Sequence, residues 1–264
     1  MSQTQKHFSQ AAQSYENHSR VQQLMAQELY DLTQPYIQAG RIMEYGVGTG
    51  HLSELLARDP RAVELEFVDF ALPMLFQAQM KVMKTQTKAQ TNFIEANIES
   101  HNLPTCASTY ISNATIQWLE DFSGFVHKCA DRLESGAVMA LSAFGENHFD
   151  AFYQTAGAIF PEFNQRQVNL YSAQQLNEIA RKAGFEVVHN ETQVRTEYFD
   201  LLKDILAHIK QMGARDSSKA YALTPGRWRA WQSAYANFAS GNESLEQKKL
   251  PLKWEYHLCV WKRI

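Results

Sequence analysis

The chain has 264 residues, of which 45% are hydrophobic and 20% are charged, and its formal net charge is −3. This composition is typical of a packed globular protein and excludes a general electrostatic attraction to nucleic acid. No apolar run approaches the roughly 18 residues that cross a bilayer, and no signal peptide precedes the polar first residues, so we expect no membrane partner.

Three cysteines lie far apart along the chain, at Cys106, Cys129 and Cys259. Their number is odd and their spacing does not match that of metal ligands. We therefore expect a reducing, cytoplasmic environment, and we expect neither a disulfide framework nor a metal site.

The segment 8–34 carries apolar residues at helical spacing, and a short strand follows it and ends at Glu44. Gly46, Gly48 and Gly50 then occupy every second position, and a helix is predicted to begin near His51. Alternating glycines let the backbone turn sharply and approach a ligand closely, because no Cβ stands in the way.

This strand, glycine loop and helix resemble the first motif of S-adenosylmethionine-dependent methyltransferases with a Rossmann-like fold. The competing interpretation is a nicotinamide-dinucleotide loop, whose G-x-G-x-x-G pattern needs a third glycine where this chain has His51. The spacing favours the methyl donor. The resemblance implies that the three glycines pass under the methionine part of the cofactor and that Glu44 lies beside it.

A second strand, Glu64–Asp69, ends in an acidic residue about 20 residues after the glycines, as a βαβ unit requires. A carboxylate at that strand end can accept hydrogen bonds from both ribose hydroxyls. Nicotinamide enzymes use the same arrangement, so Asp69 indicates an adenosine cofactor without saying which. The alternative is that Asp69 caps the helix predicted over 73–84.

Strand and helix patterns alternate through the rest of the chain, which predicts a mostly parallel sheet with right-handed crossovers. The helix over 173–182 is bounded by Ser172 as its cap and by Gly184. We expect one Rossmann-like α/β methyltransferase domain over 1–264, with seven strands of which the last is antiparallel. The further elements predicted are strands at 91–96, 110–112, 137–142, 185–188 and 254–261, and a helix at 124–133.

Two helical, aromatic-rich segments interrupt this alternation, at 144–171 and 199–241. Each follows a strand, and ligands of such folds bind at the carboxyl ends of the strands. We expect these insertions and the N-terminal helix 8–34 to form a lid that excludes water from the reaction. The alternative is that they only thicken the domain.

Three further cofactor contacts are implied by the resemblance: Asn97, Ile98 and Asn113. Asn97 follows the third strand, where the resembling enzymes carry an acid that receives the exocyclic amine of adenine. The Asn97 side-chain oxygen can accept one such hydrogen bond. A plain turn asparagine is the alternative.

A narrower resemblance rests on the run S-N-x-x-x-Q-W at 112–118, together with the segments 8–15, 142–145 and 206–214. These blocks are similar to the malonyl-[acyl-carrier protein] O-methyltransferases of biotin synthesis, from Phe8 to Val260. The chain departs from that family at Asn97, in the unusual segment 105–109, and conservatively at Glu44, where aspartate is commoner.

The resemblance implies methyl transfer from S-adenosylmethionine to the free carboxylate of malonyl-acyl-carrier protein, with S-adenosylhomocysteine as the second product. A carboxylate is already ionised at neutral pH, so the reaction needs no general base. The alternatives are a small carboxylic acid or a quinone precursor as acceptor, and an inactive cofactor-binding scaffold.

Four residues are our candidates for the acceptor side. Tyr15, Gln117 and Trp118 are expected to orient the carboxylate, and Lys210 is a possible charge partner. Each has a structural alternative in packing or in solvation of a helix face. Because carrier proteins are acidic, we expect a basic patch in the region 203–229, where a solvated mixed-charge surface is the alternative. The residues of the expected basic patch are Lys203, Lys210, Arg215, Lys219, Arg227 and Arg229.

Overall fold

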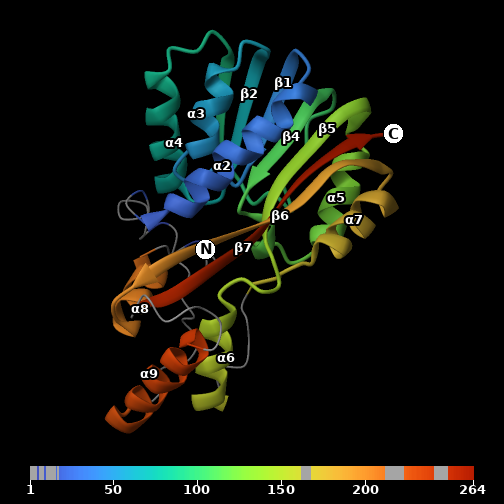
Figure 1. Cartoon of the computed structure of the whole chain (residues 1–264). Helices are drawn as coiled ribbons and strands as arrows, with labels where there is room; N and C mark the ends of the chain where they lie inside the picture. Colours follow the sequence, from blue (N-terminus) through green and yellow to red (C-terminus); the bar gives the residue numbers. More distant parts are fainter. Residues whose placement is uncertain are drawn as a thin grey trace.

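The computed structural model describes residues 18–161, 168–211, 223–240 and 249–264, together with Gln5, Ser9 and Glu16. Its centre is a seven-stranded sheet in the order β3-β2-β1-β4-β5-β7-β6 (Figure 1). The strands are β1 (Gly40–Tyr45), β2 (Ala62–Asp69), β3 (Gln90–Glu95), β4 (Ala107–Asn113), β5 (Leu133–Phe144), β6 (Phe185–Phe199) and β7 (Leu250–Arg263).

Strands β1 to β5 pair in parallel, and β7 lies antiparallel between β5 and β6. The predicted Rossmann-like sheet with an antiparallel last strand is confirmed. In the described ranges, every helix is too short or too polar to span a bilayer. Those helices are α2 (Arg20–Thr33), α3 (His51–Arg58), α4 (Leu72–Lys84), α5 (Phe122–Ala130), α6 (Asp150–Ile159), α7 (Ala173–Lys182), α8 (Leu202–Gln211) and α9 (Pro225–Ser240), with short 3-10 turns η1 (Gln34–Tyr36) and η2 (Ile116–Trp118).

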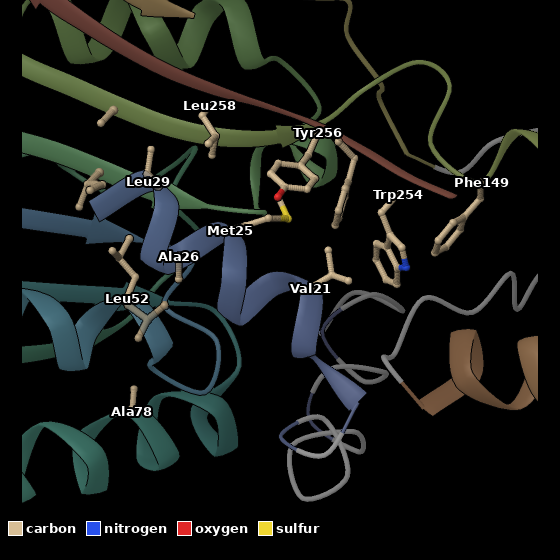
Figure 2. Packing of buried hydrophobic residues seen from close by; sticks show 14 of the residues in the cluster. Val21, Met25, Ala26, Leu29, Leu52, Ala78, Phe149, Trp254, Tyr256 and Leu258 are labelled. Carbon is tan, nitrogen blue, oxygen red and sulfur yellow. The ribbon is translucent and has the colours of Figure 1, made fainter. Parts of the chain in front are cut away.

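Two hydrophobic cores cover the two faces of the sheet. Alternate residues of β1 divide between them, because successive side chains of a strand point to opposite faces. Ile42 packs with α2, α3 and α4, whereas Met43 packs with α5 and α7. Figure 2 shows Met25 and Leu29 of α2 beside Leu258 of β7, with the same helix passing over Leu52 of α3.

The helix predicted over 8–34 is interrupted, because Ser19 is not helical and α2 begins only at Arg20. The described helix α2 closes at Thr33, and a 3-10 turn with Pro35 follows. Pro35 has no N–H to donate to the carbonyl of Asp31, so the α-helical hydrogen-bond ladder cannot continue through it, which accounts for this boundary. Most of the predicted segment before residue 18 lies outside the described residues.

Strands β6 and β7 are much longer than predicted, and this corrects the expected spans 185–188 and 254–261. They pair from Phe185 with Arg263 to Phe199 with Leu250. This antiparallel pair of strands extends well beyond the other strands of the sheet, toward α6, α8 and α9 (Figure 1). Much of β6 is half-buried or exposed, so its sequence lacks the apolar run by which a buried strand is recognised.

The two insertions contribute helices that pack on each other. Trp231 of α9 donates a hydrogen bond from Nε1 to Thr155 Oγ1 of α6 over 3.1 Å, and its ring contacts Phe152 and Phe160. Tyr235 of α9 donates to the carbonyl of Pro251 at the start of β7 over 2.7 Å. The insertions thus form a helical layer attached to the extended strands β6 and β7. Their predicted action as a lid stays a prediction.

Candidate active site

A cavity opens at the carboxyl ends of β1, β2 and β4. It encloses about 580 Å³ of empty space, part of it open to solvent. Its lining residues are Gln22, Glu44, Gly46, Val47, Gly48, Thr49, His51, Leu52, Asp69, Phe70, Met74, Asn113, Ala114, Thr115 and Trp118.

The glycine loop forms one wall, and its three glycines have different tasks. All three have positive φ, at 68° for Gly46, 55° for Gly48 and 85° for Gly50. A Cβ at Gly46 would collide with the side chain of Thr115, and one at Gly50 would lie 2.6 Å from the Cα of Ala78. A Cβ at Gly48 would meet nothing within 4 Å. Gly46 and Gly50 therefore permit close packing, and Gly48 leaves room for a ligand.

Asp69 stands at the end of β2 and faces the cavity from a buried position. Its Oδ2 accepts from the N–H of Gly48 and its Oδ1 from the N–H of Ala71, each over 2.8 Å. Burial raises the pKa of Asp69 to about 6, although these N–H groups act in the opposite direction. The N-cap of α4 is Ala71, without a side-chain bond, so the capping alternative is wrong. Each carboxylate oxygen keeps acceptor capacity for a ligand hydroxyl.

Glu44 stands at the end of β1, and its side chain is 1% exposed. Its Oε2 is buried and has no hydrogen-bond partner among the described residues. Burial, together with the negative charge of Asp69, raises the pKa of Glu44 to about 8. A buried carboxyl oxygen without a partner is costly, so Glu44 is suited to a ligand that brings a cation or an N–H donor.

The acids around the cavity suit a positively charged ligand, whose charge favours their ionised forms. Glu44 and Asp69 line it, whereas the described part of the lining contains no lysine or arginine. A sulfonium nucleoside with an ammonium group and two ribose hydroxyls would complement both acids. The residues present therefore fit the cofactor that the glycine loop implies.

Asn113 lines the cavity, but its amide serves contacts within the protein. Its Nδ2 donates to the carbonyl of Gln22 over 3.0 Å, and its Oδ1 accepts from Ser142 Oγ over 2.6 Å. Asn113 therefore ties α2 to the carboxyl ends of β4 and β5. Its predicted contact with the cofactor stays a prediction.

Asn97 and Ile98 do not line the cavity. Asn97 is exposed, and its Oδ1 accepts from the N–H of Glu99 over 3.0 Å, as a turn asparagine does. Ile98 is buried with Tyr45 in the core on the other face of the sheet. The predicted cofactor contacts of these two residues stay predictions.

The four acceptor-side candidates lie in different places. Trp118, in η2, lines the cavity. Gln117 is 3% exposed, donates from Nε2 to the carbonyl of Ala114 over 2.7 Å and is not among the lining residues, so its predicted contact with the carboxylate stays a prediction. Lys210 is exposed on α8 and is absent from the lining. Tyr15 lies outside the described residues.

Sequence reasoning missed several lining residues, among them Gln22, Thr49, His51 and Thr115. Thr49 and His51 adjoin Gly50, and their place next to the glycine loop is the sequence feature that could have indicated both as lining residues. Thr115 donates to the carbonyl of Gly46 over 3.2 Å, a contact across β4 and β1 that no local pattern indicates.

The fold and the cavity define a methyltransferase, and comparison with known families agrees. The family described as "Methyltransferase domain" matches residues 17–190 of this chain. A malonyl-[acyl-carrier protein] O-methyltransferase of Bacillus cereus is 30% identical over 91% of each chain, and one of Acetivibrio thermocellus is 31% identical over 81% of this chain and 79% of its own. The chain belongs to the malonyl-[acyl-carrier protein] O-methyltransferase family.

Solved structures share the fold at much lower identity. A putative methyltransferase of Bacillus halodurans has a TM-score of 0.63 and 14% identity, over 90% of this chain and 99% of its own. The magnesium protoporphyrin IX methyltransferase of Synechocystis, solved with bound SAH, has a TM-score of 0.57 and 14% identity, over 94% and 86% of the two chains. These likenesses support the architecture.

Proposed function

We propose that this chain transfers the methyl group of S-adenosylmethionine to the free carboxylate of malonyl-acyl-carrier protein. The products are the methyl ester, which primes synthesis of the pimeloyl precursor of biotin, and S-adenosylhomocysteine. The observation that carries the proposal is the pair of buried carboxyls, Glu44 and Asp69, around an open glycine loop in a chain of this family.

The donor is held by residues at the ends of β1 and β2. Glu44 faces the positively charged methionyl end, and Asp69 accepts from the ribose hydroxyls. Gly48 leaves the space that the donor fills, because a Cβ there would meet nothing within 4 Å. The N–H groups of Gly48 and Ala71 already orient the carboxylate of Asp69. Donor binding therefore costs little free energy for ordering this side chain.

When bound, S-adenosylmethionine supplies an electrophilic methyl group to an anionic oxygen. The chain need not remove a proton, because the acceptor carboxylate is ionised at neutral pH. The protein contributes orientation and exclusion of water, and orientation alone contributes about 7–11 kcal/mol in favourable cases. Trp118 provides an aromatic wall next to the glycine loop. Such a wall suits a transition state in which opposite charges cancel.

The acceptor side is assigned to the insertions and the N-terminal segment of one methyltransferase domain over 1–264. In this proposal the segments 8–34, 144–171 and 199–241 close over the cavity, and Tyr15, Gln117, Trp118 and Lys210 act on the malonyl carboxylate.

The acidic carrier protein is proposed to dock on the basic patch of the region 203–229. Lys203, Lys210 and Arg229 are exposed in the structure. Arg227 is half-buried, with its guanidinium carbon 5.7 Å from the ring centroid of Phe160. The remaining members of the patch, Arg215 and Lys219, lie outside the described residues.

The thiols fit a reducing compartment, and we place the reaction in the cytoplasm. Cys129 and Cys259 are buried and Cys106 is exposed, and all three are free. Burial raises the pKa of the Cys129 and Cys259 thiols well above the ordinary range, which keeps both unreactive.

Incubation with methyl-labelled donor tests the proposal directly. Three acceptors are compared: malonyl-acyl-carrier protein, malonyl-coenzyme A, and free dicarboxylic acids. The proposal predicts base-labile label on the malonyl carrier, at a much higher kcat/KM than on the free acids. Label on the free acids alone would assign the chain to a small-carboxylate methyltransferase instead.

A further inference from the structure

His51 lies at the start of α3 and uses both ring nitrogens in contacts around the cavity. Its Nδ1 is 3.1 Å from Lys81 Nζ, and its Nε2 is 3.0 Å from Ser19 Oγ and 3.3 Å from Thr49 Oγ1. An ammonium group only donates, so Nδ1 is the acceptor and the ring proton is on Nε2. Burial, with the charge of Lys81, lowers the pKa of His51 to about 4, so the ring stays neutral.

Lys81 connects this histidine to the chain just before α2. Its ammonium donates to both carboxylate oxygens of Glu16, over 2.7 and 2.8 Å. Burial alone would raise the pKa of Glu16, but the hydrogen bond from Lys81 and the positive charge of Lys81 outweigh burial and lower it. Glu16 Oε2 also lies 3.7 Å from His51 Nε2. Glu16, Ser19, Thr49, His51 and Lys81, hereafter the polar brace, form one connected cluster.

The polar brace joins three walls of the cavity. Ser19 is the N-cap of α2, Thr49 belongs to the glycine loop, and Lys81 lies in the last turn of α4. The same three elements line the cavity, α2 with Gln22 and α4 with Met74. The hydroxyl of Ser19 makes no capping hydrogen bond to a backbone N–H of α2. It bonds instead to His51 Nε2, and this bond connects the start of α2 to α3.

The proposed methyl transfer gives the brace no chemical task. His51 is a neutral ring with both nitrogens engaged, and the acceptor brings its own negative charge. We propose that His51 and Lys81 are positioning residues that fasten the start of α2 to the glycine loop and so hold that wall of the cavity against the bound methyl donor. This inference rests on the proposed function, because it takes the ligand of the cavity to be S-adenosylmethionine.

When a contact of the polar brace is removed, we expect the ligand of the cavity to dissociate faster. Lys81→Met removes the ammonium that contacts both Glu16 and His51, while it keeps the length of the side chain. We expect the dissociation constant of S-adenosylhomocysteine to rise about fivefold, mainly through the dissociation rate, as fits a partly exposed ion pair. Arg58→Met is the matched control, because Arg58 pairs with Glu54 on the same helix α3 and neither residue lines the cavity.

Four proteins complete the experiment: wild type, Lys81→Met, Glu16→Gln and the Lys81→Met/Glu16→Gln double variant. Calorimetry gives the affinity for S-adenosylhomocysteine, stopped-flow gives its dissociation rate, and thermal melting monitors the fold. The double variant should bind no more weakly than Lys81→Met, because both changes break one contact. The exchanged pair Glu16→Lys/Lys81→Glu should recover part of the lost affinity, which a general loss of stability would not.

The outcomes separate the two proposals. Equal affinity in wild type, Lys81→Met and Glu16→Gln overturns the polar brace and leaves the methyltransferase proposal intact. Failure of the wild-type protein to bind the donor overturns the proposed function itself. Should Lys81→Met fail to fold, Glu16→Gln decides, because its side chain is 44% exposed and its change leaves the core untouched.

Discussion

The cavity and the insertion helices differ in how their polar side chains are held. In the cavity, Glu44 and Asp69 are buried at strand ends, and backbone N–H groups fix Asp69. On the insertion helices, where the acceptor is proposed to bind, Lys210 stands exposed on α8 and Arg229 on α9. The side chains proposed for the donor are therefore held by the protein itself, whereas those proposed for the acceptor are free to move in solvent. This difference predicts large, local effects of substitutions in one region and small, substrate-dependent effects in the other.

The largest effect is expected from Asp69→Ala. The change removes the acceptor of two backbone hydrogen bonds together with the proposed ribose contact. We predict a fall in kcat/KM of about 100-fold, as hydrogen bonds to a charged group are worth about 1.5–3 kcal/mol. Steady-state kinetics with varied donor measures it. Glu64→Gln is the control on the same strand β2, where Glu64 pairs with Arg41 far from the cavity. An Asp69→Ala enzyme with unchanged donor affinity would contradict the assignment.

Two glycine substitutions should separate folding from binding. In Gly46→Ala the new Cβ would collide with the side chain of Thr115, and residue 46 would also have to keep its positive φ. We predict that the free energy of unfolding falls by about 3 kcal/mol. Gly48→Ala meets no neighbour, so only about 1 kcal/mol of backbone strain is expected, with at least tenfold weaker donor binding. Thermal melting and calorimetry measure the two quantities. Equal donor affinity in Gly48→Ala and wild type would show that the loop does not face the ligand.

Donor binding should release a proton and depend on pH. Burial holds the pKa of Glu44 at about 8 in the free protein, so the group is mostly protonated at pH 7. A cationic donor favours the carboxylate, so affinity should rise from pH 7 to a plateau above pH 8, by about tenfold. Calorimetry in two buffers of different ionisation enthalpy measures the released proton. Glu44→Gln should bind more weakly and lose the pH dependence. A pH-independent wild type would contradict this role.

The smallest effect is expected on the acceptor side. Lys210→Glu and Arg229→Glu reverse exposed charges, which steer an acidic partner more than they hold it. We predict that KM for malonyl-acyl-carrier protein rises about fivefold in the double variant, and that the effect fades at high salt. Activity with malonyl-coenzyme A provides the internal control and should change little. Equal losses with both acceptors would place the carrier elsewhere.

The cavity residues proposed for the donor were predictable because their signals are local in the sequence. A strand that ends in Glu44, three spaced glycines and a second strand that ends in Asp69 occupy one βαβ unit. Periodicity and spacing suffice to place these residues at one edge of the sheet. The antiparallel last strand followed from the resemblance, whereas the order of the strands in the sheet was not predicted.

Contacts between distant segments were not predictable from the sequence. Asn113 was expected at the cofactor, yet its amide bonds to Gln22 and Ser142 from other elements. His51 has its partners in Ser19 and Lys81, and no local pattern reports such a cluster. The long β6 was underestimated because its exposed side chains lack an apolar run.

Calorimetric titration of the wild-type protein tests the central claim, that the glycine loop and its two acids hold a sulfonium nucleoside. S-adenosylmethionine and S-adenosylhomocysteine should each bind at a single site, and NADH should give no binding heat. Saturable binding of NADH, with no heat from either adenosyl compound, would contradict the account.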